Sequence, residues 1–448
     1  MFFKDIDYLA PDFSIQHGDV LVEGKVIRSV GPAAGVPGSG EVVSGSGKLL
    51  IPGLYNCHTH IPMTLLRGYA EGLPLQSWLN DKVFPFEAKI KDPDAYYASQ
   101  LAVAEMLRFG TVSFSDMYDY SDQRAQVVLE SGIKANLCNG FTVFDDRGYE
   151  ETPYYEIDKH MVADYHGAAA GRLKVELNIH AEYTTTPKVV EAVGEAALAY
   201  GVGTHIHLSE TKAEHEECKQ RHGGLTPAAY FDSLGFFRQP CICAHCVWVT
   251  PEDIELLQAR GATAVLNPAS NMKLGSGFAP VGEMLAAGLN VALGSDGVAS
   301  NNSHNLFKDL YLLAIAYKGA NHDPLCVSPA EALAAATVNG AAAQGRATAG
   351  QDRDGQPVAP GGQIAPGYAA DLCLLDVSGP WMQPATNLLN NLVYSAQGTD
   401  VLMTMVDGQV LYDRRGLDAA DPAAYKTIDV EKAAAETAAA TQRILSAL

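Results

Sequence analysis

Two histidines, His58 and His60, stand two residues apart at the end of an apolar segment that begins at Leu49. In an extended strand, residues i and i+2 point to the same side, so both imidazole rings face one way. Neutral imidazole is the commonest metal ligand and suits zinc, iron or nickel. The pair therefore indicates the start of a metal site, and two histidines on a solvated strand face are the alternative.

Three further apolar segments end in polar residues. His207 and, three residues later, Glu210 follow one of them, His245 follows Pro240–Ala244, and Asp296 follows Val291–Leu293. In a parallel α/β barrel, catalytic residues come from the C-terminal ends of several strands. The four segments therefore predict one shared site at the strand ends, with a satisfied polar group as the alternative for any single residue.

The stretches between these segments have the signals of helices. Residues 92–109 and 187–201 each carry a proline near the start and a glycine at or just past the end, and a third helix is expected from Pro251. Strands thus alternate with helices along the chain. This alternation predicts an α/β fold.

Both ends of the chain have a different pattern. Residues 20–27 alternate as two strands joined by a turn at Glu23-Gly24, and residues 371–376 and 401–411 are also typical of strands. A Gly- and Pro-rich run, residues 350–367, marks the boundary of the barrel. The Ala-rich tail, residues 423–448, predicts a helix that packs on the barrel or on another subunit.

The composition excludes several classes of partner. The 448 residues carry a net charge of −21, and a negative field repels nucleic acids and anionic membrane surfaces. No stretch of eighteen apolar residues and no secretory signal pattern is present, so we expect a cytoplasmic protein with a small-molecule substrate. The length exceeds the roughly 250 residues of a barrel, which leaves material for a second module.

The cysteines point to core packing. Eight cysteines are too few for a disulfide scaffold in a chain of this length. Cys241, Cys243 and Cys246 mimic a thiolate metal cluster, but no second cysteine pair supplies the remaining ligands of a structural zinc site. We expect these residues to be buried thiols.

Together with further segments, these motifs resemble the amidohydrolase superfamily. The further segments are Pro52-Gly53, Asn267–Asn271, Gly294–Asn302 and Gly367–Leu372. The chain is most similar to the S-adenosylhomocysteine/5'-methylthioadenosine deaminases of the mononuclear-zinc branch. The resemblance implies a (β/α)8 TIM-like barrel over residues 53–359 and a small β-sandwich built from residues 1–52 and 360–418. Residues 419–448 would then be a C-terminal helical segment.

The resemblance also implies the site. The ligands of one divalent metal, zinc or alternatively iron, would be His58, His60, His207 and Asp296. Glu210 would move a proton from water to the purine ring, and His245 and Asp296 would orient that water. The alternatives are a first-turn helix carboxylate for Glu210 and a buried hydrogen-bonded histidine for His245. No lysine lies within Val175–His180, where binuclear relatives carry a bridging lysine, so a single metal is expected.

Trp78 and Glu87 match positions where adenosine-type deaminases place an aromatic wall and a carboxylate for the ribose hydroxyls. His180 would also contact the substrate. The alternatives are a core tryptophan, a solvated glutamate and a histidine bonded to backbone. Arg147 would grip the carboxylate of a homocysteine tail, but it lies among acidic residues with which it can pair, and Tyr154-Tyr155 stands where a second arginine is expected.

We therefore predict hydrolytic deamination of an adenine nucleoside to its inosine analogue and ammonia. The substrate would be 5'-methylthioadenosine, S-adenosylhomocysteine, adenosine or 5'-deoxyadenosine. The alternatives are deamination of guanine, a pterin or cytosine, and hydrolytic dechlorination of a triazine. A non-catalytic scaffold protein is the remote alternative, because such proteins lose the ligand residues that this chain retains. We also expect a homo-oligomer.

Overall fold

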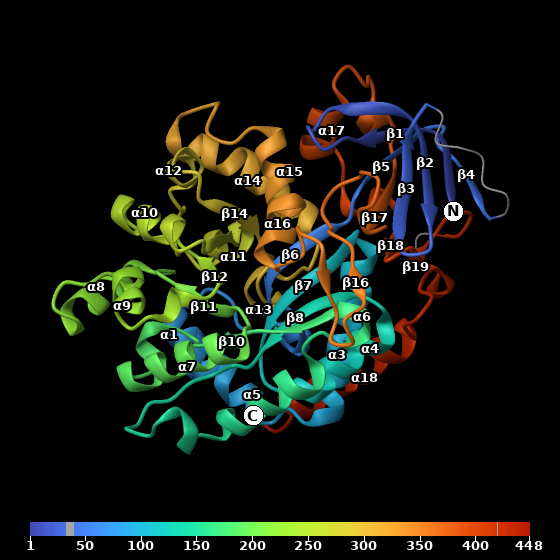
Figure 1. The fold of residues 1–448 in the computed structure, drawn as a ribbon. Coiled ribbons are helices and arrows are strands. Elements are labelled where there is room, and N and C mark those ends of the chain that lie inside the picture. Colours follow the sequence, from blue (N-terminus) through green and yellow to red (C-terminus); the bar gives the residue numbers. More distant parts are fainter. Residues whose placement is uncertain (33–39, 419) are drawn as a thin grey trace.

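The computed structural model describes residues 1–32, 40–418 and 420–448 (Figure 1). Parallel strands in chain order form its centre. One four-stranded sheet contains β6 (Leu54–Thr59), β7 (Thr111–Met117), β8 (Lys134–Cys138) and β9 (Leu173–Val175). A five-stranded sheet contains β10 (Leu177–Asn178), β11 (Thr204–Leu208), β12 (Cys241–His245), β13 (Thr263–Leu266) and β14 (Asn290–Leu293).

The two parallel sheets are continuous in sequence and meet again at their outer strands. Only Glu176 separates β9 from β10. At the other side, the backbone N–H of Asp296, just after β14, donates to the carbonyl of His58 in β6 at 2.9 Å. The sheets therefore follow one another around a common centre, which confirms the predicted parallel α/β architecture in outline.

The three helices expected from the sequence are present. They are α3 (Asp92–Arg108), α7 (Pro187–Tyr200) and α10 (Pro251–Ala259), and each has a proline in its first two positions. Gly201 ends α7 at a φ of 68°, a conformation that glycine adopts without steric cost. The sequence signals for helix start and stop were therefore correct to within about one residue.

Other helices lie between the strands or after the last of them (Figure 1). They include α4 (Ser121–Ser131), α5 (Pro153–Tyr165), α8 (Lys212–Arg221), α9 (Pro227–Ser233), α11 (Pro268–Lys273), α12 (Val281–Ala286), α14 (Leu306–Asn321), α15 (Pro329–Ala336) and α16 (Val338–Ala343). Along β11, Ile206 and Leu208 pack in one apolar cluster with Val189 and Val193 of α7. The period of two then leaves His205 and His207 on the opposite face of the strand.

The two ends of the chain share a separate eight-stranded sheet beside the parallel strands (Figure 1). Its order is β19-β18-β17-β5-β1-β2-β3, with β4 beside β1. The strands are β1 (Phe2–Leu9), β2 (Ile15–Glu23), β3 (Val26–Gly31), β4 (Val42–Ser44), β5 (Lys48–Pro52), β17 (Leu372–Asp376), β18 (Val401–Val406) and β19 (Gln409–Asp413). The predicted pairing of the two ends is therefore present, and the hairpin of β2 and β3 turns at Gly24-Lys25, one residue later than expected.

The prediction for the C-terminal tail is wrong in where the helix starts. After a 3-10 turn at Pro422–Ala424, the helix α18 runs only from Val430 to Leu445, because the Asp429 side chain caps it by accepting from the N–H of Lys432 at 3.0 Å. Helix α18 packs on α3 of the same chain, and Arg443 pairs with Asp94. Residue 419, the expected start of this segment, and residues 33–39, within the expected sandwich, lie outside the described residues.

Two predictions on composition can be compared with the structure. All eight cysteines are free thiols, and Cys241, Cys243 and Cys246 are buried in the core, as expected. In the described part of the chain, none of the helices combines the length and the hydropathy that a membrane span requires.

Candidate active site

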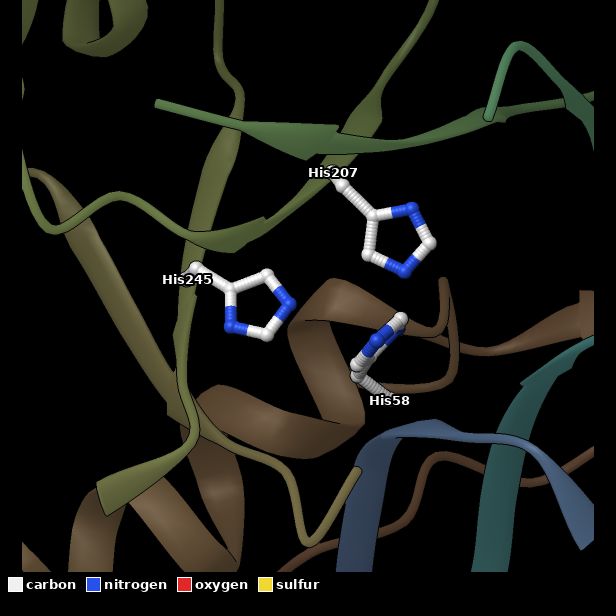
Figure 2. A group of neighbouring side chains, drawn as sticks. All are labelled: His58, His207 and His245. Atoms are coloured by element: carbon white, nitrogen blue, oxygen red, sulfur yellow. The ribbon is translucent and has the colours of Figure 1, made fainter. Parts of the chain in front are cut away.

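Four histidines converge at the carboxyl ends of three parallel strands: His58 and His60 at the end of β6, His207 in β11 and His245 in β12. The ring centroid of His58 lies 4.8 Å from those of His60 and His207 and 5.4 Å from that of His245. Figure 2 shows His58, His207 and His245 pointing toward a common point from β6, β11 and β12. The structure thus brings together residues that the sequence separates by up to 187 positions.

The donor atoms of this cluster fit a divalent metal. Asp296 Oδ1 lies 3.2 Å from His60 Nε2 and 3.5 Å from His58 Nε2, and His60 Nε2 lies 3.4 Å from His207 Nε2. The Nε2 atom of His58 is fully buried and has no hydrogen-bond partner among the residues that the structure describes. Because a buried polar atom without a partner is costly, this nitrogen is explained best as a ligand. Three imidazoles and one carboxylate suit zinc or iron.

Backbone carbonyls orient two of the imidazoles. His60 Nδ1 donates to the carbonyl of Met117 at 2.6 Å, and His207 Nδ1 donates to the carbonyl of His180 at 2.8 Å. Because a carbonyl only accepts, Nδ1 must carry the hydrogen in both rings, and each Nε2 keeps its lone pair. This is the arrangement that a metal-binding histidine requires.

Asp296 is held by hydroxyl donors on the side away from the histidines. Its Oδ2 accepts from Ser270 Oγ at 2.6 Å and from Ser300 Oγ at 3.1 Å, and Oδ1 accepts from the N–H of Gly297 at 2.8 Å. Burial opposes ionisation, but the facing His58 and His60 hold the pKa of Asp296 well below its ordinary value. The carboxylate is therefore ionised and fixed in direction.

The backbone is strained at the same strand ends. Ser209, His245 and Asp296 have φ values of 49°, 74° and 62°, in the left-handed region that residues other than glycine rarely adopt. Each such residue costs of the order of 1–3 kcal/mol and persists where the surroundings impose it, as at active sites. Two of these residues, His245 and Asp296, are candidate site residues from the sequence, and the third, Ser209, directly precedes Glu210.

Glu210 faces this cluster from the loop after β11. Its Oε2 lies 3.7 Å from His245 Nε2, and its Oε1 accepts from Ser276 Oγ at 3.3 Å. Burial raises the pKa of Glu210, so the carboxyl can exchange a proton more readily near neutral pH. Glu210 does not cap the following helix α8, because Thr211 and Glu214 form that capping box. The structure therefore disfavours the alternative of a purely structural carboxylate.

His245 has one nitrogen bound to protein and one facing the site. Its Nδ1 lies 2.8 Å from Asn271 Oδ1 and 3.3 Å from Asn267 Nδ2, and the shorter contact, to an oxygen that only accepts, places the hydrogen on Nδ1. Its Nε2 points toward Glu210 and toward the centre of the cluster, where the position of the ring is visible in Figure 2. His245 is therefore both the hydrogen-bonded histidine of the alternative reading and a group available to a ligand.

A cavity of about 490 Å³ opens beside the cluster. Five of the predicted metal-binding and catalytic residues line it: His60, His207, Glu210, His245 and Asp296. Apolar and aromatic side chains make up much of the rest of its lining, among them Leu75, Leu79, Val83, Phe84, Phe144, Tyr154, Tyr183 and Leu274. A volume of this size accommodates a small organic molecule.

Three predicted substrate-binding residues line the same cavity. Trp78, at the end of α1 (Leu75–Trp78), is 5% exposed and packs in an apolar cluster. Glu87 ends α2 (Phe84–Glu87) and accepts a hydrogen bond from the Tyr118 hydroxyl. Burial raises its pKa to about 7. His180 follows β10, and burial lowers its pKa to about 4, so this ring is neutral at physiological pH.

Arg147 is the predicted substrate contact that the structure does not bring to the cavity. Its guanidinium is 52% exposed and pairs with Asp145 at 2.9 Å. It is absent from the cavity lining in the described part of the chain. The alternative that the sequence allowed, an ion pair with neighbouring acids, is what the structure contains.

The sequence analysis missed three residues around the site. Asp119 and Tyr118, at the end of β7, line the cavity beside Glu87. His205 lies buried beneath His58, with its Nε2 at 2.9 Å from His58 Nδ1. His205 and His207 have the same i, i+2 spacing that drew attention to His58 and His60, so this signal was available in the sequence.

The chain is similar to known proteins over most of its length. The model of the family described as "Amidohydrolase family" matches residues 49–411. A 5-methylthioadenosine/S-adenosylhomocysteine deaminase of Dictyoglomus thermophilum is 39% identical over 96% of this chain and 95% of its own length. A 5'-deoxyadenosine deaminase of Methanosarcina acetivorans is 38% identical over 94% of each chain.

Solved structures agree with this result. An adenosine deaminase from Xanthomonas campestris with bound zinc superposes with a TM-score of 0.88 at 29% identity, over 99% of this chain and 98% of that protein. The atrazine chlorohydrolase of Arthrobacter aurescens, complexed with zinc, superposes with a TM-score of 0.86 at 22% identity, over 98% and 99% of the two chains. The second likeness concerns the fold alone.

Proposed function

This chain belongs to the amidohydrolase family, and we propose that it is a metal-dependent deaminase that hydrolyses an adenine nucleoside to the inosine analogue and ammonia. The observation that carries the proposal is the position of Glu210. Its buried carboxyl is free of the capping box and faces both the cluster of imidazoles and the cavity. The relatives from Dictyoglomus thermophilum and Methanosarcina acetivorans are named as deaminases of adenosine derivatives, which supports this assignment.

We assign His58, His60, His207 and Asp296 as the ligands of one divalent metal, with zinc as the first choice. The unpartnered Nε2 of His58 and the carbonyl-bound Nδ1 atoms of His60 and His207 support this set. A zinc ion bound there supplies a nucleophilic water at neutral pH, because it lowers the pKa of water from about 15.7 to about 7. The zinc-containing adenosine deaminase of similar fold favours zinc over iron.

Glu210 moves the protons of the reaction. It takes one from the attacking water and delivers it to the ring nitrogen of adenine next to the carbon that is attacked. His245 Nε2 donates no proton while Nδ1 carries the hydrogen, so this ring accepts a hydrogen bond from the water and orients it. Asp296 would receive the second proton of the water and pass it to the departing amino group, so that the carbon–nitrogen bond breaks with release of ammonia and the carboxylate is regenerated. General acid–base catalysis of this kind contributes about 10²–10⁴-fold in rate.

The cavity also supports a nucleoside as the substrate. Glu87 offers a carboxylate that can accept from two vicinal ribose hydroxyls, and Tyr118 fixes its direction. Trp78 supplies an apolar wall, and neutral His180 can hydrogen-bond the base. These roles separate a nucleoside from a free base such as guanine or cytosine, which has no ribose for Glu87 to bind.

The cavity lining favours an uncharged 5' substituent. Neither lysine nor arginine lines the cavity in the residues that the structure describes, and Asp119 adds a carboxylate. An anionic tail would therefore lack a partner and lose its solvation. We propose 5'-methylthioadenosine, 5'-deoxyadenosine and adenosine as better substrates than S-adenosylhomocysteine, whose carboxylate Arg147 does not reach.

We propose in addition that the parallel strands β6–β14 close into one (β/α)8 barrel over residues 53–359, with β9 and β10 as one interrupted strand. The sheet of the chain ends, in residues 1–52 and 360–418, would curl into the expected sandwich. Its buried apolar side chains, among them Ile6, Val20, Leu374 and Met405, form one cluster of their own, which supports such curling. A cytoplasmic homo-oligomer remains part of the proposal.

The test is ammonia release by zinc-loaded protein from a set of substrates. Adenosine, 5'-methylthioadenosine, 5'-deoxyadenosine and S-adenosylhomocysteine are compared with guanine, cytosine, a pterin and a chlorinated triazine, with chloride release measured for the last. We expect activity on the nucleosides and loss of that activity on metal removal, with recovery when zinc is restored. Activity on free bases or the triazine alone would overturn the nucleoside assignment.

A further inference from the structure

Three buried side chains form a row that leads away from the proposed metal ligands. His58 Nδ1 lies 2.9 Å from His205 Nε2, and His205 Nδ1 lies 3.4 Å from Glu176 Oε2. The two histidines are fully buried, and Glu176 is 5% exposed. The row therefore lies inside the ring of parallel strands, on the side of His58 that faces away from the cavity.

If His58 Nε2 is a metal ligand, only one placement of the ring hydrogens satisfies the contact between His58 Nδ1 and His205 Nε2. The lone pair of His58 must then be free at Nε2, so its hydrogen lies on Nδ1 and is donated to His205 Nε2. His205 Nε2 is the acceptor, so the hydrogen of that neutral ring lies on Nδ1. Among the described residues, neither His205 Nδ1 nor Glu176 Oε2 has a hydrogen-bond partner, and the 3.4 Å between them is a charge-pair distance rather than a hydrogen bond. These two atoms are thus left for each other.

Glu176 is itself fixed in place. It occupies the single position between β9 and β10, where its backbone N–H donates to the carbonyl of Leu137 at 3.0 Å. Asn136 Nδ2 donates to Glu176 Oε1 at 2.7 Å, and Arg346 Nη2 donates to Asn136 Oδ1 at 2.9 Å. A buried carboxylate is costly unless it is paired, and here one oxygen is bound by Asn136 while the other faces His205.

His58 differs in this respect from the other two histidines of the proposed ligand set. His60 and His207 donate from Nδ1 to main-chain carbonyls, which no substitution of a side chain removes. Of the three histidines, only His58 is oriented by a side chain, that of His205, which a substitution can remove. Partners that fix a ligand histidine typically change metal affinity or activity by about 10–100-fold when they are mutated.

We infer that His205, supported by Glu176, is a positioning residue that holds His58 in the tautomer and orientation in which Nε2 binds the metal. The inference rests on the proposed metal site. His205 touches neither the cavity nor its ligand, so its effect passes entirely through His58. The expected consequence of its loss is a metal that leaves faster, not a different substrate preference.

The experiment measures zinc release from the loaded protein into an excess of a chelating dye. H205A is expected to release zinc about 10–100-fold faster than the wild type. H205Q is expected to lie between the two, because the amide oxygen of glutamine can still accept from His58 Nδ1. E176Q, which keeps an acceptor for His205 but removes the charge, is expected to be several-fold faster than the wild type.

His166→Ala is the matched control. This histidine is half-buried, and its ring bonds only the backbone of Val175, away from the cluster. It is expected to release zinc at the wild-type rate. Melting temperatures of the zinc-free and zinc-loaded forms are measured in parallel, and the difference between them should shrink in H205A and stay constant in H166A.

The outcomes separate the two proposals. If H205A lowers the melting temperature of both forms equally and releases zinc at the wild-type rate, the residue is merely structural and the inference is overturned. If H205A does not fold, the zinc release rates of H205Q and E176Q decide the question. The inference is overturned if both variants release zinc at the wild-type rate. A wild-type protein that binds no zinc would instead overturn the proposed function.

Discussion

The backbone N–H of Glu210 donates to the side chain of Glu214, with 2.7 Å between nitrogen and Oε2. The N–H of Ser209 donates to the other oxygen of Glu214 at 2.9 Å. Glu214 thereby holds the turn after β11 and caps helix α8 together with Thr211. Because Glu214 performs the structural task, the carboxyl of Glu210 is free to face His245 and the cavity.

This division of tasks predicts the effect of Glu210→Gln. Glutamine keeps the size of the side chain but cannot accept and return a proton. We expect kcat to fall by about 10²–10⁴-fold, while bound zinc and the melting temperature stay close to those of the wild type. Glu216→Gln, an exposed position on the following helix α8, serves as the control. A fall of less than tenfold in kcat would exclude Glu210 as the proton carrier.

Glu87 predicts a pH dependence of substrate binding. Burial raises the pKa of this carboxyl to about 7, although the Tyr118 hydrogen bond opposes the shift. Below pH 7 the protonated form loses acceptor capacity for the ribose hydroxyls, so KM for adenosine should rise as the pH falls from 8 to 6. The comparison substrate is 2',3'-dideoxyadenosine, for which KM should change little. Glu87→Gln should remove the pH dependence of KM. If KM of this variant still rises toward low pH as it does in the wild type, the role of Glu87 is contradicted.

No lysine or arginine lines the cavity among the described residues, so a cation introduced there should change the substrate preference. Phe144 lines the cavity and is 74% exposed, so a longer polar side chain can replace it without loss of core packing. We expect Phe144→Arg to raise kcat/KM for S-adenosylhomocysteine relative to 5'-methylthioadenosine by about tenfold, which corresponds to one charge-assisted hydrogen bond. Phe144→Gln is the uncharged control. An equal change of kcat/KM for both substrates would contradict the proposal.

Asp158 predicts how stability depends on pH away from the site. Its carboxylate accepts from Asn139 Nδ2 at 2.6 Å and from the Tyr149 hydroxyl at 2.8 Å, and burial raises its pKa to about 7. Between about pH 4 and 7 the folded state then binds more protons than the unfolded state. The contribution of Asp158 to stability is therefore full at low pH and lost as the pH rises through 7.

The measurement is thermal unfolding at pH 5 and pH 8. Between pH 5 and pH 8 the loss of stability from this residue amounts to at most about 3 kcal/mol, so the melting temperature should fall less in Asp158→Asn than in the wild type over this range. Glu156→Gln changes an exposed carboxyl of the same helix. The melting temperature of this variant should fall as much as that of the wild type. An identical pH profile in D158N and the wild type would show that burial of Asp158 has no such effect.

Much of the fold and of the site was predictable because it is written in short-range patterns. The prolines and glycines at the ends of α3 and α7 mark those helices locally. Polar residues that follow apolar strands, such as His245 and Asp296, share one site because parallel strands end at the same face. For this reason the candidate metal and catalytic residues could be selected before the structure was known, even though the roles assigned to them still await the experiments above.

Other predictions failed or were missing because they depend on which loops meet. The charge pattern around Arg147 permits both a substrate contact and the ion pair with Asp145, and only the path of the loop decides between them. The start of α18 was misplaced because an Ala-rich composition does not show that Asp429 caps the helix. The role of His205 was not visible in the sequence because its contacts with His58 and with Glu176, between β9 and β10, form only in the folded chain.

The sequence by itself determined the alternation of strands and helices and the set of candidate polar residues at the strand ends, because periodicity and residue type are local properties. Only the tertiary structure decided that Glu214 rather than Glu210 caps helix α8, that the cavity has no cationic side chain among its described residues, and that His205 supports His58. These facts depend on distances of about 3 Å between segments far apart in the chain, and those distances are set by how the strands and loops pack together.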